Sequence, residues 1–183
     1  MTVPAEQDER IAELVREEVQ RTLRGFRRKT TIVAFSGEMD RMFAALSLAS
    51  ASAACGLETT VFFTFWGLSA LRKPAAKSGL GKSWLDRMLA RMLPAGCGKL
   101  PVSRMNFGGG GAAFFRWLMH SRNVQSAGDL LDDARALGVR LVACQMSLDV
   151  LGLRREELID GIEIGGAATF LQDASESTVT LFV

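Results

Sequence analysis

The stretch Val139-Arg-Leu-Val-Ala-Cys144, followed at once by Gln145-Met-Ser147-Leu-Asp149, decides the fold of this 183-residue chain. Its first part is apolar and β-branched, which predicts a buried strand that ends on Cys144. Its second part is typical of the start of a short helix. In an open α/β sheet, ligands and chemistry gather just outside the carboxyl ends of the strands. Cys144 is therefore the first candidate for a functional residue.

Strands and helices alternate on both sides of this stretch. We expect strands at residues 30–36, 58–65, 139–144, 161–164 and 177–183. The spacing of apolar residues predicts helices at about 39–55, 126–137, 154–160 and 166–175. This alternation predicts a three-layer α/β/α domain with a mostly parallel five-stranded sheet that is covered on both faces.

Two segments fall outside this simple pattern. Residues 1–29 hold an amphipathic helix at 5–27 and a basic run, and we expect this extra helix to pack on the domain at 30–183 or on a second subunit. Residues 66–120 are too long for a simple connection and form an insertion rich in Trp and Gly. Helical stripes occur there at 84–92 and 112–119. Its excess of apolar and glycine-rich sequence predicts a homo-oligomer.

Charge is concentrated in the insertion. Residues 66–120 carry nine Lys or Arg residues and one acid, although the net charge of the whole chain is only +2. This segment is either a solvated surface, a docking face for an acidic partner protein, or a contact with an anionic membrane, with Arg87 and Arg91 as the docking residues. Binding to nucleic acid is not expected, because no recognised nucleic-acid-binding module is present.

Composition excludes several classes of site. Three cysteines without metal-ligand spacing argue for free thiols in a reducing compartment, which predicts a cytoplasmic protein. The single histidine, His120, makes a histidine-rich metal site or a Ser-His-Asp triad implausible. We expect neither a metal nor an organic cofactor. There is also no uncharged apolar run of about 18 residues that would span a membrane.

Two cysteines are candidates for sulfur chemistry. Cys144 would lie near the helix-start N–H groups of Gln145, Met146 and Ser147, whose partial positive charge favours a thiolate. The alternative is a buried structural cysteine. Cys97 lies between two glycines and is followed by Lys99, so it is either a second redox thiol or an incidental loop cysteine.

Three separated motifs, in this order, carry a resemblance to a known family. They are Phe63-Thr-Phe-Trp-Gly-Leu68 with Leu71-Arg-Lys73, Ala143-Cys-Gln-Met-Ser-Leu-Asp-Val150, and Asp160-Gly-Ile-Glu-Ile-Gly-Gly166 with Ala168-Thr-Phe and Leu181-Phe-Val183. From about Thr31 to Val183 the chain resembles the DsrE/DsrF-like family, in particular its longer single-chain subgroup, often labelled peroxiredoxin-like. The label itself finds no support, since no Pro-Xaa-Xaa-Xaa-Thr-Xaa-Xaa-Cys pattern occurs here.

The resemblance implies a Rossmann-like domain, homo- or hetero-oligomers, and a cysteine persulfide handed between cytoplasmic sulfurtransferases. Cys144 would then be the carrier cysteine, acting like a sulfurtransferase, with another sulfur-carrier protein as partner. Cys97 lies outside the matched motifs. Two other functions stay open at this point: a non-enzymatic oligomeric or membrane-peripheral assembly subunit, and a binder of a small molecule such as a nucleotide or flavin.

Overall fold

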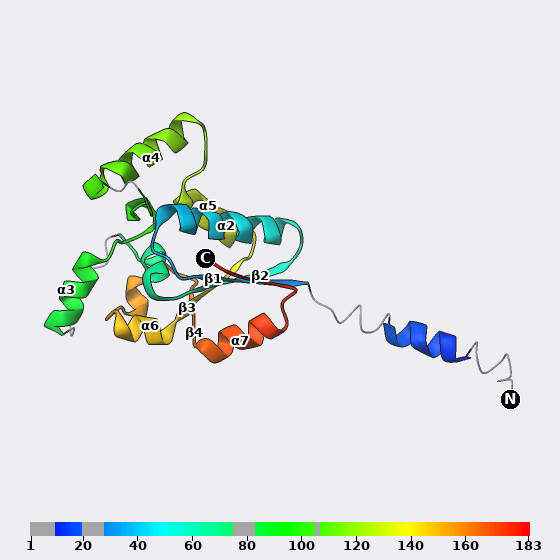
Figure 1. The fold of residues 1–183 in the computed structure, drawn as a ribbon. Helices are drawn as coiled ribbons and strands as arrows, with labels where there is room; N and C mark the ends of the chain where they lie inside the picture. The colour runs from blue at the N-terminus through cyan, green and yellow to red at the C-terminus, as the bar shows by residue number, and fades with distance from the viewer. Residues whose placement is uncertain (1–9, 20–27, 75–82, 105–106) are drawn as a thin grey trace.

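A parallel sheet of five strands forms the centre of the computed structural model, which describes residues 10–19, 28–74, 83–104 and 107–183 (Figure 1). The strand order is β4-β3-β2-β1-β5, and every neighbouring pair is parallel. The strands are β1 (Lys29–Ala34), β2 (Glu58–Phe63), β3 (Arg140–Cys144), β4 (Glu163–Gly165) and β5 (Val179–Phe182). The predicted five-stranded sheet is therefore confirmed.

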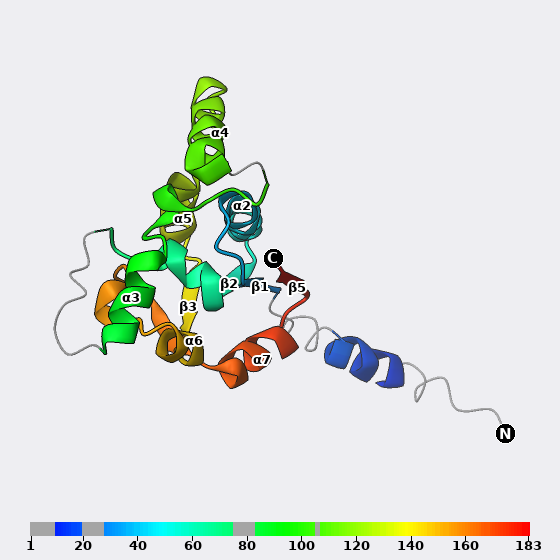
Figure 2. The ribbon, with the colours of Figure 1, turned by 60° about the vertical axis from the view of Figure 1, so that its left-hand side comes forward.

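Helices cover both faces of the sheet. On one face lie α2 (Met39–Ala54) and α5 (Ala127–Ala136), which pack against each other, and on the other lie α6 (Gln145–Val150) and α7 (Ala167–Ser175) (Figures 1 and 2). The strands β1, β2 and β3 are buried along nearly their whole length, and the side chains of Ile32, Val61 and Phe63 are fully buried between the layers. This is the three-layer α/β/α arrangement that the sequence predicts.

The register aligns the carboxyl ends of the central strands at one edge. Phe63 at the end of β2 pairs with Ala143 in β3, and Cys144 pairs with Gly165 in β4. The residue after Phe63 consequently lies beside Cys144. This alignment positions the candidate site.

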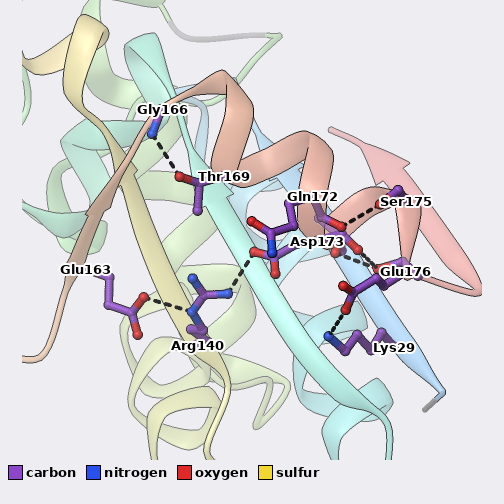
Figure 3. A network of polar contacts seen from close by, with 11 residues as sticks. Lys29, Arg140, Glu163, Gly166, Thr169, Gln172, Asp173, Ser175 and Glu176 are labelled. Carbon is purple, nitrogen blue, oxygen red and sulfur yellow. Dashed lines mark hydrogen bonds and ion pairs between the residues drawn. The ribbon is translucent and has the colours of Figure 1, made fainter. Parts of the chain in front are cut away.

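Ion pairs hold α7 and the sheet together. The Arg140 guanidinium bridges Glu163 on β4, at 2.8 Å, and Asp173 on α7, at 2.7 Å (Figure 3). Lys29 at the start of β1 pairs with Glu176, just after α7. Because α7 supplies Phe170, whose ring lies 5.5 Å from that of Phe62, these pairs help to fix the cover over the cluster that contains Cys144.

The prediction of a helix at 154–160 is wrong. Only a 3₁₀ turn forms there, η4 (Arg155–Glu157), and the chain then runs extended. The backbone N–H of Lys73 donates to the Glu157 carbonyl at 2.8 Å, and the N–H of Ile159 donates to the Leu71 carbonyl at 2.8 Å. These distant bonds align residues 157–159 against residues 71–73, which is incompatible with a helix.

The insertion contains the two expected helices, α3 (Trp84–Met92) and α4 (Gly110–Ser121), with 3₁₀ turns η1 (Phe65–Leu71), η2 (Cys97–Lys99) and η3 (Phe107–Gly109). α4 extends away from the three layers (Figures 1 and 2). Near the N-terminus, residues 10–19 form a helix whose apolar residues Ile11, Leu14, Val15 and Val19 are all more than half exposed. That stripe is thus not buried on the domain, and its packing on a second subunit stays a prediction. The division of the chain into an N-terminal segment at 1–29 and a domain at 30–183 also stays a prediction.

Candidate functional site

Cys144 is the last residue of β3 and the N-cap of α6. Only 5% of its surface is exposed. It shares a small buried cluster with Phe62 and Val142, against which Phe170 packs. The predicted position, at the carboxyl end of a central strand and the start of a short helix, is what the structure shows.

Polar donors surround the Cys144 sulfur and change its acidity. Burial acts to raise the pKa of the thiol, because a low-dielectric environment disfavours the thiolate. Hydrogen bonds to the sulfur from the Ser147 hydroxyl and N–H, from the Thr64 hydroxyl and from the Met146 N–H act in the opposite direction. Together they outweigh burial, so the pKa of Cys144 lies below its ordinary value of 9.0. The site therefore favours a thiolate, which is the nucleophilic form of cysteine.

Thr64 and Ser147 form a pair of hydroxyls at this sulfur. Their oxygens are 2.9 Å apart, although Thr64 follows β2 and Ser147 lies on α6. Each hydroxyl has a single proton, which it donates either to its partner or to the sulfur. Deprotonation of Cys144 attracts both protons towards the sulfur, so the pair can stabilise the negative charge as it forms.

Sequence reasoning missed Thr64, because a strand was expected through residue 65. β2 instead ends at Phe63, and the chain turns into η1 with Phe65 at φ 44°, a left-handed conformation that is rare outside glycine. Gly67 makes this turn possible, since a Cβ there would lie 2.1 Å from the Ala34 carbonyl oxygen. The available signal was the strand order: a hydroxyl that follows a strand next to β3 ends at the same edge as Cys144.

The three predicted helix-start residues have different environments. Ser147 is fully buried, and both its hydroxyl and its N–H face the sulfur, while Met146 contributes its N–H. Gln145 instead donates its side-chain amide to the Asp149 carboxylate at 2.8 Å. The Met146 side chain is exposed and forms part of the surface near the thiol.

Cys97 has the opposite environment from Cys144. It is buried in η2, and its thiol donates to the Ala70 carbonyl at a sulfur–oxygen distance of 3.6 Å. Burial, with a smaller contribution from the negative charge of Asp132, raises the pKa of Cys97 to about 12. A thiol that stays protonated is a poor nucleophile. We therefore leave Cys97 out of the proposed function.

No group of three or more His, Cys, Asp or Glu residues in the described ranges is arranged to hold a metal ion.

The predicted docking residues Arg87 and Arg91 lie on α3, at the surface. A crevice of about 350 Å³ opens near the carboxyl end of β1, with Phe35, Arg41 and Trp66 in its wall. Among the described helices, none is long and apolar enough to cross a membrane.

Comparison with known proteins places this chain in a family. Residues 27–182 match the DsrE/DsrF/DrsH-like family, and the chain belongs to it. The structure of the ychN protein from E. coli has a similar fold, with a TM-score of 0.53 and 19% identity over 85% of this chain and 99% of that one. The resemblance inferred from the three motifs is thereby confirmed.

Two full-length relatives are similar in sequence. The chain is 42% identical to the uncharacterized protein YrkE of Bacillus subtilis (strain 168) over 156 residues. This alignment covers 85% of this chain and 97% of that protein. It is also 34% identical to the sulfur carrier protein DsrE2 of Allochromatium vinosum over 160 residues. This second alignment covers 85% of this chain and 98% of that protein.

Proposed function

We propose that this chain is a sulfur-trafficking protein that carries sulfane sulfur as a persulfide on Cys144. This proposal rests on the thiol at the end of β3, whose pKa is lowered by hydrogen-bond donors of Thr64, Met146 and Ser147. The likeness to a sulfur carrier protein supports the general role. The free cysteines fit a reducing compartment, so a cytoplasmic location remains our prediction.

The proposed reaction is an exchange between thiols and persulfides and needs no added oxidant. The Cys144 thiolate attacks the outer sulfur of a donor persulfide, a new sulfur–sulfur bond forms, and the donor leaves as a thiolate. In the second step an acceptor thiolate attacks the outer sulfur on Cys144. The bond to Sγ breaks, its electron pair returns to Cys144, and the acceptor becomes the persulfide.

Incubation with glutathione persulfide tests this function directly. The peptide that contains Cys144 should gain one sulfur atom in mass analysis, and a subsequent incubation with an acceptor thiol should remove it. A chain that gains sulfur only on Cys55 or Cys97 would contradict the proposal.

Ser147→Ala is expected to slow loading near neutral pH by about tenfold, the effect of losing one hydrogen bond of about 1.5 kcal/mol to a charged group. The loss raises the pKa of Cys144 and so lowers its thiolate fraction. The wild-type loading rate should rise with pH through a midpoint below 9.0, since only the thiolate reacts. In Ser147→Ala this midpoint should move to higher pH. Stopped-flow measurement of thiol alkylation against pH gives both profiles.

Thr64 offers a matched pair of variants for the same profile. Thr64→Val removes the hydroxyl with little change of shape and should shift the midpoint in the same direction as Ser147→Ala. Thr64→Ser keeps the hydroxyl and should retain the wild-type midpoint. If all three variants titrate like the wild type, the hydroxyl pair does not set the acidity of Cys144.

We also propose that the protein is a homo-oligomer. α4 exposes Phe114, Phe115 and Trp117, and the helix at 10–19 exposes an apolar stripe as well. Exposed apolar surface of this extent is typical of interaction sites. Multi-angle light scattering should therefore give a mass of at least twice that of one chain, and Phe114→Glu with Trp117→Glu should reduce it. A monomer mass at every concentration of the wild type would exclude the oligomer.

The crevice beside β1 is the observation that favours the second candidate function, a small-molecule binder. Phe35 and Trp66 could contact an aromatic ring, and Arg41 could approach an anionic group. A flavin would be visible in the absorbance spectrum of the purified protein. The third alternative, an assembly subunit with a structural Cys144, predicts a thiol that resists both alkylation and loading.

A further inference from the structure

The nine-residue helix α3 exposes an apolar stripe that no other described part of the chain covers. The side chains of Trp84, Leu85, Met88 and Met92 are each at least 46% exposed. Contiguous exposed side chains of this size mark an interaction site, and helices with such faces bind complementary apolar surfaces. α3 is therefore suited to contact another molecule.

Two arginines border this stripe. Arg87 and Arg91 are one helical turn apart, both are exposed, and neither forms an ion pair with any residue that the structure describes. Arg140, in contrast, is paired with the carboxylates of both Glu163 and Asp173 (Figure 3). α3 thus combines an apolar centre with a positive edge that pairs with none of the described carboxylates, the usual division between the core and the rim of a protein interface.

The position of α3 relates this surface to the thiol. Both ribbon views show α3 on the same side of the molecule as α6 (Figures 1 and 2). α6 begins immediately after Cys144. A molecule bound on α3 would accordingly lie near the edge of the sheet where sulfur is exchanged.

We infer that α3 docks the protein that exchanges sulfur with Cys144, and that this partner presents an apolar patch bordered by carboxylates. The inference rests on the proposed function. A protein fits better than a membrane, because the transfer step requires a thiol to be delivered to Cys144, a residue that is only 5% exposed. Opposite charges at the rim would speed the encounter and orient the partner.

Two synthetic amphipathic peptides test this inference. Both have the same apolar face and one cysteine, but the polar face carries Glu in one and Lys in the other. Cys144 is first loaded from glutathione persulfide, and the rate of sulfur transfer to each peptide is divided by the rate at which that peptide reacts with glutathione persulfide itself. At low salt the Glu peptide should accept sulfur about tenfold faster, and high salt should remove the difference.

Charge reversal on α3 should reverse this preference. Arg87→Glu with Arg91→Glu should make the Lys peptide the faster acceptor while loading from glutathione persulfide stays unchanged. Lys99→Glu with Arg122→Glu, a matched reversal of two other exposed cations, should keep the wild-type preference. Circular dichroism verifies that both variants are folded.

Each remaining outcome has a definite meaning. Equal normalised rates for the two peptides on the wild type would overturn the docking inference while the persulfide function stands. A wild type that does not load from glutathione persulfide would contradict the proposed function instead. If the α3 reversal abolishes binding to phosphatidylglycerol vesicles and leaves the peptide preference intact, α3 contacts a membrane and the inference is wrong.

Discussion

Cys144→Ser is expected to reduce persulfide loading to the background level, a loss of about a hundredfold or more, because a serine oxygen cannot replace the thiolate nucleophile. The substitution is nearly isosteric, and the donors from Thr64, Met146 and Ser147 remain in place. The folded structure should therefore survive. Mass analysis of the protein after incubation with glutathione persulfide, followed by peptide mapping, measures the loss.

The two other cysteines provide the controls. Cys55→Ser changes an exposed thiol, and Cys97→Ala removes a buried thiol whose pKa is about 12. Both variants should load Cys144 within about twofold of the wild-type rate, since neither thiol belongs to the group of donors around Cys144. If Cys144→Ser still gains sulfur while Cys97→Ala does not, the carrier is Cys97 and the proposed site is wrong.

The sheet could be predicted because short runs of neighbouring residues indicate its strands. Runs such as residues 139–144 are apolar on both faces, which is a local signal of a buried parallel strand. Glycine positions added reliable helix ends: Gly56 and Gly138, both with positive φ, follow α2 and α5. These features depend on neighbouring residues only, so the sequence contains them directly.

Features that depend on distant contacts could not be predicted in the same way. The predicted helix at 154–160 does not form, because hydrogen bonds to residues 71–73, far away in the sequence, hold this segment extended. Cys97 looked like a loop thiol between flexible glycines, but it is buried and donates to Ala70. Thr64 joins Ser147 only because β2 and β3 are neighbours in the sheet. The sequence thus located the candidate thiol, while the groups that lower its pKa could be identified only from the fold.

Arg72→Met is expected to lower the free energy of unfolding by about 3–5 kcal/mol, the usual cost of removing one partner from a buried ion pair. Arg72 is 5% exposed, at the end of η1. Its Nη1 donates to the carbonyls of Leu93 at 2.8 Å and Pro94 at 3.2 Å, and its Nη2 lies 3.9 Å from Glu157 Oε2. The variant leaves these buried acceptors without their donor, and urea denaturation measures the loss.

The adjacent residue is a matched control. Lys73 pairs with Asp160 at 2.9 Å, but the Lys73 side chain is partly exposed and that of Asp160 is almost fully exposed, so Lys73→Met should cost at most about 1 kcal/mol. Adding Glu157→Gln to Arg72→Met should recover part of the loss, because it removes the buried charge but leaves the Leu93 and Pro94 carbonyls unsatisfied. Equal costs for Arg72→Met and Lys73→Met would mean that burial adds nothing to the Arg72 contacts. A cost confined to Arg72 would show instead that its buried contacts with Leu93, Pro94 and Glu157 stabilise the end of η1 against the insertion.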